Sequence, residues 1–197
     1  IDFATISGKK WIMSKTEITQ VVYKAIMGEN PSHFKGDSLP VENVSWYDAV
    51  EFCNRLSKKA GFEPAYSING RTVEWNRNAS GFRLPTVEDW QYAARGGENY
   101  KYSGSDNLDE VGWYIDNSGS KTHPVAQKKP NGYGLYDMSG NVWEWCWDSS
   151  FSGEYRYGCG GSWSNYADLC EVDSKHWYLA DDTYSRLGFR VVRSAGK

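Results

Sequence analysis

The chain has 197 residues, a formal net charge of −3 and 16% aromatic residues, with 10 Trp and 14 Tyr. Its basic residues are scattered, and no apolar run approaches the roughly 18 residues that cross a bilayer, so we expect neither nucleic-acid binding nor direct membrane insertion by this domain. Many large rings in a chain with a mean hydropathy of −0.68 favour a loop-rich fold over a Leu/Ala-rich helical bundle.

The N-terminal part of the chain predicts a hairpin followed by two helices. Weak alternation of apolar residues over 1–14 indicates the hairpin. Thr19 and Gly28 are placed to begin and end a short helix. Ser45 and the aspartate three positions later form a capping-box pattern, which predicts a main helix over 46–60.

The middle of the chain predicts a second main helix and a second hairpin. Thr86 and the aspartate three positions later predict a helix over 86–95, and Asn69-Gly70 predicts a tight turn before it. After residue 98 the helical periodicity disappears. Short apolar segments predict strands at 134–136, 142–147, 160–163 and 188–193. We therefore expect an α+β fold with two main helices, short antiparallel strands and long ordered loops, in a single domain over 1–197.

The cysteines, at positions 53, 146, 159 and 170, do not indicate a zinc site, because there is no CxxC and there are only three histidines. Cys53 falls on the apolar stripe of the helix over 46–60 and is predicted to be a small buried hydrophobe. One disulfide stays open, with Cys159 and Cys170 as the nearest pair.

Several framework motifs occur together in an order that resembles one family. The motifs are VENVSWYDA at 41–49, GFRLPT at 81–86, GLYDM at 134–138, GNVWEW at 140–145, GGSW at 160–163 and LGFRV at 187–191. Together they resemble the formylglycine-generating-enzyme/sulfatase-modifying domain, a branch of the C-type lectin fold, over roughly residues 13–193. The resemblance implies one of three outcomes on this fold: an oxygenase that makes formylglycine, an iron-dependent sulfoxide synthase domain, or a binding protein without chemistry.

The resemblance implies a copper site, held by two cysteines shortly after Gly-Gly-Ser, in the members that make formylglycine. Soft thiolates suit Cu(I), but here the first position is Asn165 and only the second, Cys170, is a cysteine. We therefore expect a protein that is not an enzyme and requires no cofactor. A sulfoxide synthase would need a histidine-rich helical domain that the sequence lacks. A formylglycine-generating-like copper oxidase remains the alternative.

The resemblance also implies structural calcium, for which oxygen-rich loops are suitable. Asn141 and Glu144 of the GNVWEW motif are the candidate ligands, with Asp116-Asn117 as a weaker pair. The competing interpretation is that Glu144 pairs with an arginine, such as Arg190, while Asn141 caps a turn.

The segment over 164–185 lies between two framework motifs, is rich in Ser, Asn, Tyr and Asp, and has neither helical nor strand periodicity. It resembles the variable region of proteins diversified by retroelements, such as treponemal variable surface proteins, in which adenines of Asn codons are randomised. This resemblance implies a variable ligand-binding region over about 155–193. Glu171, Lys175 and Trp177 cannot arise from such codons and are interpreted as framework.

Eleven of the remaining polar and aromatic positions of this segment are predicted to bind the ligand. They are Ser164, Asn165, Tyr166, Asp168, Ser174, His176, Tyr178, Asp181, Asp182, Tyr184 and Ser185. Tyr with Ser, Asn and Asp is the composition of antibody paratopes, and aromatic residues dominate binding hot spots, so the three tyrosines are the expected exposed anchors. The expected partner is a protein or other macromolecule, and the resemblance implies a cell-surface or extracellular location. The competing interpretation is a solvated polar loop.

Overall fold

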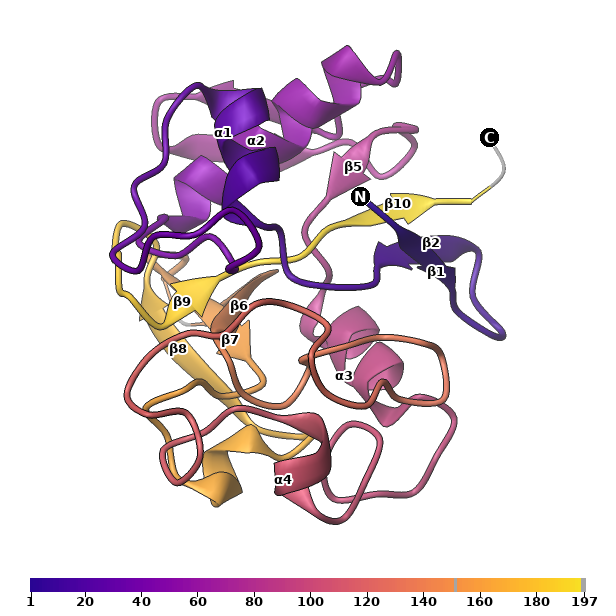
Figure 1. Cartoon of the computed structure of the whole chain (residues 1–197). Helices are drawn as coiled ribbons and strands as arrows, with labels where there is room; N and C mark the ends of the chain where they lie inside the picture. Colours follow the sequence, from indigo (N-terminus) through magenta and orange to yellow (C-terminus); the bar gives the residue numbers. More distant parts are fainter. Residues whose placement is uncertain (151, 196–197) are drawn as a thin grey trace.

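A computed structural model describes residues 1–150 and 152–195, which form an α+β fold (Figure 1). The helices are α1 (Gln20–Met27), α2 (Trp46–Lys59), α3 (Val87–Arg95), α4 (Leu108–Val111) and the 3₁₀ helix η1 (Ala167–Cys170). The strands are β1 (Phe3–Thr5), β2 (Trp11–Ser14), β3 (Tyr66–Asn69), β4 (Thr72–Trp75), β5 (Phe82–Arg83), β6 (Trp143–Ser150), β7 (Tyr155–Cys159), β8 (Lys175–Leu179), β9 (Leu187–Gly188) and β10 (Val192–Ser194).

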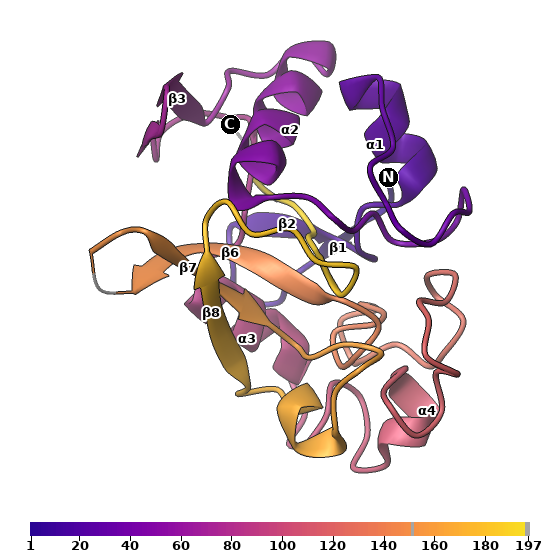
Figure 2. The same ribbon diagram turned by 90° about the vertical axis from the view of Figure 1, so that its left-hand side faces the viewer.

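Two four-stranded sheets and one separate hairpin organise these strands. The first sheet has the order β1-β2-β10-β5, so the last strand of the chain pairs with the N-terminal hairpin. The second has the order β8-β7-β6-β9, with β9 parallel to β6 and the other pairs antiparallel. In Figure 1, α1 and α2 lie at the top of the molecule and α3 lies in its lower half. In Figure 2, β8 lies at the front of the molecule, on the edge of its sheet.

Local sequence accounts for where the helices begin and end. The side chains of Ser45 and Thr86 accept hydrogen bonds from the backbone N–H three positions later, and both predicted capping boxes are formed. Gly28 and Gly96 end α1 and α3 in the left-handed region, at φ 87° and 64°, where a side chain would be strained. The helices that the sequence predicts are therefore confirmed to within a residue or two at their ends.

Large aromatic rings build the core, as the composition predicts. Trp46, Trp90, Trp143 and Trp145 are all at most 2% exposed. Trp143 and Trp145 project from one face of β6, so the period-two pattern does mark a buried strand face. Trp163, which lies in a framework motif, is only half-buried.

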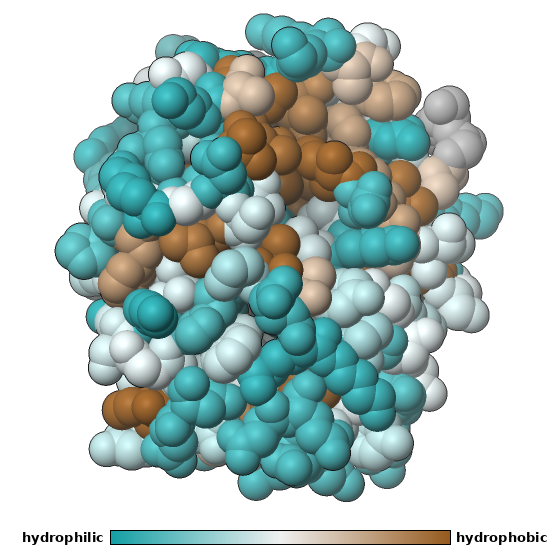
Figure 3. Space-filling view, viewed as in Figure 1, coloured by the Kyte–Doolittle hydropathy of each residue, from teal (hydrophilic) through white to brown (hydrophobic). Residues whose placement is uncertain are grey.

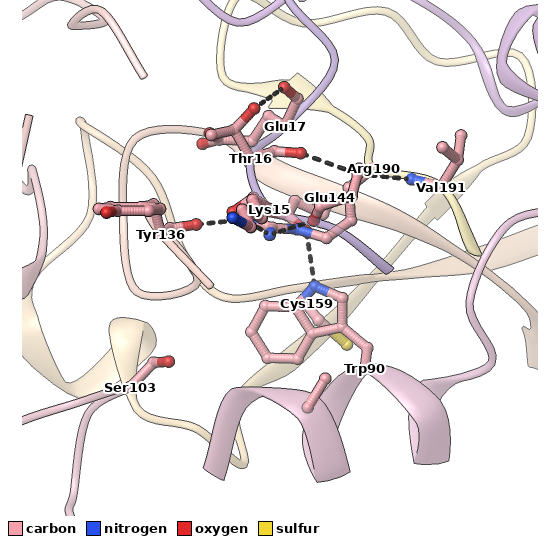
Figure 4. A network of polar contacts seen from close by, with 12 residues as sticks. Lys15, Thr16, Glu17, Trp90, Ser103, Tyr136, Glu144, Cys159, Arg190 and Val191 are labelled. Atoms are coloured by element: carbon pink, nitrogen blue, oxygen red, sulfur yellow. Dashed lines mark hydrogen bonds and ion pairs between the residues drawn. The ribbon is translucent and has the colours of Figure 1, made fainter. Parts of the chain in front are cut away.

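A buried ion pair links segments from both ends of the chain (Figure 4). Arg190 and Glu144 form two hydrogen bonds, with Nε 2.7 Å from Oε2 and Nη2 2.8 Å from Oε1. The indole N–H of Trp90 on α3 donates to the same Oε2 at 2.6 Å, and Arg190 donates to the carbonyls of Tyr136 and Ser14 at 2.7 and 3.2 Å. The interpretation of Glu144 as the partner of Arg190 is confirmed.

Two of the strands predicted from apolar segments are wrong. Residues 134–136 are not a strand because they leave a turn at 131–134, where the side-chain oxygen of Asn131 accepts the backbone N–H groups of Tyr133 and Leu135 at 3.0 and 3.2 Å. Residues 160–163 are not a strand, because Gly160 and Gly161 adopt φ values of 96° and 73°.

Other strand boundaries differ from the prediction in smaller ways. The segment at 188–193 divides into β9 and β10, and the hairpin turn is Gly70-Arg71, one residue later than predicted. The sequence also missed β7 and β8, and β8 lies inside the segment that shows no periodicity. Since β8 is exposed at every residue except Tyr178, it lacks the alternation by which a half-buried strand is recognised.

All four thiols are buried, and none of them is in a disulfide. The sulfur of Cys159 lies 3.6 Å from that of Cys146 on the neighbouring strand, so the nearest pair in space is not Cys159 and Cys170. Cys53 of α2 is buried in the core, and burial raises the pKa of its thiol. Its predicted role as a small hydrophobe is confirmed.

The face shown in Figure 3 is unevenly polar. Apolar side chains gather on its upper half, over α1 and the N-terminal segment, whereas the lower half is mostly polar. Ile1 and Val21 are about half exposed, at 48% and 49%. None of the helices formed by the described residues is long and apolar enough to cross a membrane.

A second buried carboxylate, Glu17, lies close to the ion pair but has no hydrogen-bond partner at either side-chain oxygen among the described residues. Burial raises the pKa of Glu17 well above its usual value, and the negative charges of Asp137 and Glu144 act in the same direction. The folded state therefore binds more protons than the unfolded state. Stability from this group is present at low pH and is lost as the pH rises above the ordinary pKa of 4.5.

Glu17→Gln is predicted to increase the free energy of unfolding at pH 8, by on the order of 1 kcal/mol, because an amide avoids the cost of burying or protonating a carboxyl group that is ionised in the unfolded state. Urea unfolding from pH 4 to pH 8 should also show that the free energy of unfolding changes less with pH in the variant than in the wild type. The exposed Glu29→Gln is the control and should leave the pH dependence unchanged. A loss of stability in Glu17→Gln at every pH would contradict this account of the site.

Candidate functional site

A cavity of about 300 Å³ opens at the surface beside β8. Its lining comes from the start of β6, the loop after Gly-Gly-Ser-Trp, η1, β8 and the turn before β9. The lining residues are Trp143, Ser164, Asn165, Leu169, His176, Tyr178 and Arg186. Segments far apart in the sequence therefore meet at one concave site, and four of the predicted ligand-binding residues contribute to it.

The aromatic wall of the cavity is fixed to the core. Trp143 is 2% exposed, and its backbone N–H donates to the carbonyl of Arg186 at 2.7 Å. Tyr178 is 8% exposed, and its ring meets those of Trp143 and Trp145 edge-on at centroid distances of 6.4 and 5.9 Å. Such T-shaped contacts add to the packing energy, so this wall is well packed against the core.

The loop that forms the opposite wall is held by local hydrogen bonds instead of regular secondary structure. The hydroxyl of Ser162 donates to the side-chain oxygen of Asn165 at 2.6 Å and lies 3.2 Å from the hydroxyl of Ser164. The carbonyl of Asn165 accepts the backbone N–H of Ile115 at 3.0 Å. These contacts explain why an ordered loop shows no helical or strand periodicity in its sequence.

Arg186 is the permanently charged residue of the lining. Its guanidinium carbon lies 4.7 Å from the centre of the Tyr184 ring, in a cation–π contact. Burial raises the pKa of Tyr178, and the nearby Arg186 guanidinium opposes that rise. The cavity therefore combines one cation with aromatic walls and neutral hydrogen-bonding groups.

Exposed apolar side chains lie close to the cavity in the sequence and fold. Tyr166 is 69% exposed, Leu169 41%, Trp177 45% and Leu179 44%. Large apolar side chains exposed together on one segment commonly mark an interaction site. Tyr166 was predicted, but the other three were not, and Trp177 was interpreted as framework.

Several predicted residues shape loops and do not line the cavity. Asp182 accepts the backbone N–H of Leu179 at 2.9 Å, and the hydroxyl of Ser174 donates to the carbonyl of Asp168 at 2.9 Å. Ser185 is half-buried, and its carbonyl accepts the indole N–H of Trp163 at 3.0 Å.

Asp181 belongs to a different hollow of the same region. This second cavity has a volume of about 380 Å³ and is lined by residues that include Tyr47, Arg71 and Glu154. Asp181 forms an exposed ion pair with Arg71 at 2.5 Å. The predicted site residues therefore do not form a single continuous pocket.

The prediction that Tyr178 is an exposed anchor is wrong. Tyr178 points inward from β8 while its neighbours in the strand stay exposed, so it packs against the core and presents little surface to solvent. Tyr184 is half-buried and packs on Tyr178, with ring centroids 5.6 Å apart. Of the three tyrosines, Tyr166 alone has the exposure expected of an anchor.

The residues present do not fit a copper site of two thiolates. Cys170 is fully buried among Tyr102, Leu108 and their neighbours, and burial raises the pKa of its thiol to about 12. The position expected to supply the other thiolate carries the amide of Asn165, whose oxygen already accepts the hydroxyl of Ser162. One neutral thiol and one amide are not the soft ligand pair that Cu(I) prefers.

The candidate calcium ligands are engaged in other contacts. The side chain of Asn141 exchanges two hydrogen bonds with the backbone of His123, at 3.0 and 3.2 Å, and both oxygens of Glu144 bind Arg190. Asn117 accepts the backbone N–H of Tyr114 at 2.8 Å. In the part of the chain that the structure describes, no group of three or more His, Cys, Asp or Glu could hold a metal ion. These side chains do not fit the calcium site that the resemblance implied.

Comparison with known proteins places this architecture in a family. A model of the sulfatase-modifying factor enzyme 1-like domain matches residues 3–195. The chain belongs to this family. Among solved structures, it resembles Treponema denticola variable protein 1, with a TM-score of 0.89 and 36% identity, covering 98% of this chain and 91% of that one. The C-type lectin fold expected from the motifs is confirmed.

Relatives in this family carry different names. The chain is 39% identical to the chaperone protein LppX of Paenibacillus barcinonensis, over 92% of this chain and 79% of that protein. It is 29% identical to the formylglycine-generating enzyme of Mus musculus, over 90% of this chain and 54% of the enzyme. The chain thus spans about half the length of that enzyme. Family membership alone therefore does not decide between catalysis and binding.

The sequence could have pointed to only some of the residues that it missed. The sequence correctly predicts that Trp143 is buried in the core. It does not indicate that the same residue also lines the cavity. Arg186 stands next to the LGFR motif without any pattern of its own. Codon composition does not reveal the exposure of Trp177, because it indicates only which positions can vary.

Titration with Cu(I) in the presence of a competing chelator tests whether the chain can bind copper through Cys170. We expect no tight one-to-one binding that depends on Cys170, because the second thiolate is missing. Cys170→Ala, with its fold verified by circular dichroism, should behave like the wild type. Stoichiometric tight binding that is lost in this variant would contradict our assignment of the site.

Proposed function

We propose that this chain is a ligand-binding protein that recognises a protein or another macromolecule through its C-terminal surface, over about 155–193. The observation that carries the proposal is the exposure of Tyr166 beside a cavity whose wall is fixed to the core. A rigid scaffold that presents exposed rings and adaptable polar groups is suited to recognition, because little entropy is lost on binding.

The names of relatives give this proposal further support. One of them is called a chaperone and another a variable protein, and a chaperone acts by binding other proteins. We include in the proposal that a retroelement diversifies the C-terminal surface and that the protein acts at the cell surface or outside the cell. A near-copy of the codons for 155–193, with Asn codons at the varied positions and beside a reverse transcriptase, would be the genomic trace of such diversification.

We also propose that the chain is not an enzyme and needs no cofactor. The support is the amide of Asn165 at the position where formylglycine-generating members are expected to carry a cysteine, together with the buried thiol of Cys170. Membership of the family favours the alternative, a formylglycine-generating-like copper oxidase. The Cu(I) titration described above separates these two functions.

Panning of a random 12-residue peptide library against the immobilised protein tests the proposal. Peptides selected on the wild type should bind Tyr166→Ser at least about tenfold more weakly, because truncation of an exposed aromatic anchor removes a hot spot. Val21→Ser is the matched control, since Val21 is an exposed apolar residue of α1 in a different part of the fold. Selected peptides that bind all three proteins equally would contradict the proposed surface, as would a library that yields no binder.

A further inference from the structure

We propose that the cavity beside β8 binds a carboxylate of the ligand, supplied by an acidic protein side chain, with Arg186 as the opposite charge. This inference deepens the proposed function and rests on it, because it names the chemistry that the site would recognise. It follows from the charges and hydrogen bonds around the cavity.

The first observation is a cation without an acidic partner. Arg186 lines the cavity and has no ion pair among the described residues. Its guanidinium is held over the ring of Tyr184 at 4.7 Å, next to Tyr178. A planar guanidinium held in this way offers paired N–H donors that match the two oxygens of a carboxylate.

The second observation is that nearby carboxylates are engaged elsewhere. Asp181 pairs with Arg71 at 2.5 Å, and Asp182 accepts the backbone N–H of Leu179 at 2.9 Å. Asp168 accepts the N–H of the residue that follows it at 3.0 Å. None of these carboxylates forms an ion pair with Arg186, so the positive charge of Arg186 remains available to a ligand.

The third observation concerns the remaining lining. Ser164, Asn165 and His176 contribute neutral or titratable hydrogen-bonding groups, while Trp143 and Tyr178 contribute apolar faces. The indole N–H of Trp143 is buried and has no hydrogen-bond partner among the described residues. Aromatic faces with one fixed cation suit an apolar stem that ends in a single negative charge. A phosphate dianion would leave one of its charges uncompensated by this lining.

A small probe tests the assignment without the unidentified ligand. We would titrate 3-phenylpropionate and its uncharged analogue 3-phenylpropionamide into ¹⁵N-labelled protein, following the indole signal of Trp143 and the guanidinium signal of Arg186 by NMR. The carboxylate is expected to bind about ten- to hundredfold more tightly than the amide, which is the range for a hydrogen bond to a charged group. Arg186→Gln should abolish this preference.

Matched variants guard against a purely structural effect. Lys175→Gln removes a cation of β8 that does not line the cavity, and it should keep the preference for the carboxylate. Arg186→Lys retains the charge but not the paired donors, so it should keep only part of the preference for the carboxylate. This variant tests the inference if Arg186→Gln fails to fold. Melting temperatures of all variants would be measured alongside the titrations.

Three results would overturn the inference. They are equal affinity for the acid and the amide (including no detectable binding of either), an unchanged preference in Arg186→Gln, and a response to inorganic phosphate as strong as that to the carboxylate. These failures differ from failure of the proposed function. Peptides selected by panning could bind through Tyr166 without any acidic residue, whereas the small probe reports only on the cavity.

Discussion

The buried ion pair between Arg190 and Glu144 is the contact on which the rest of the fold depends. Two buried charges are tolerated because each one is hydrogen-bonded several times, to the partner, to the indole of Trp90 and to backbone carbonyls. Removal of one partner from such a pair typically costs about 3–5 kcal/mol, because the other charge is left uncompensated. The pair and the indole of Trp90 thereby join α3, β6 and the segment before β10.

This arrangement has a consequence for the surface beside β8. Glu144 follows Trp143 directly in β6, so the strand that carries the ion pair also carries the aromatic wall of the cavity. The polar side chains around the cavity are therefore attached to a scaffold that the buried ion pair of Glu144 and Arg190 stabilises. We infer that exposed positions such as Tyr166 contribute little to the stability of the fold and can serve recognition.

The sequence predicts most of the framework because its signals are local. The capping boxes at Ser45 and Thr86 and the glycines after α1 and α3 act within one helical turn, so they can be read without knowledge of the fold. The combination of short motifs indicates the family, and Glu144 could be paired with Arg190 because both lie within those motifs.

The candidate site is harder to predict because long-range contacts create it. β8 is an edge strand without alternation, and only its pairing with β7 shows that Tyr178 points inward while Trp177 stays exposed. The cavity exists because Trp143, Asn165 and Arg186 meet in space, although no motif connects them. Residue type is therefore an incomplete guide to burial, because Trp177 is 45% exposed whereas the neighbouring Tyr178 is only 8% exposed.

The central claim is that the surface can vary independently of the scaffold. Two libraries displayed on yeast test it most directly, with protease resistance as the measure of folding. One library is randomised at Ser164, Tyr166, Asp168 and His176, and the other at Trp90, Glu144, Tyr178 and Arg190. The account predicts that most members of the first library remain as resistant as the wild type, whereas most members of the second do not. Equal loss of resistance in both libraries would contradict it.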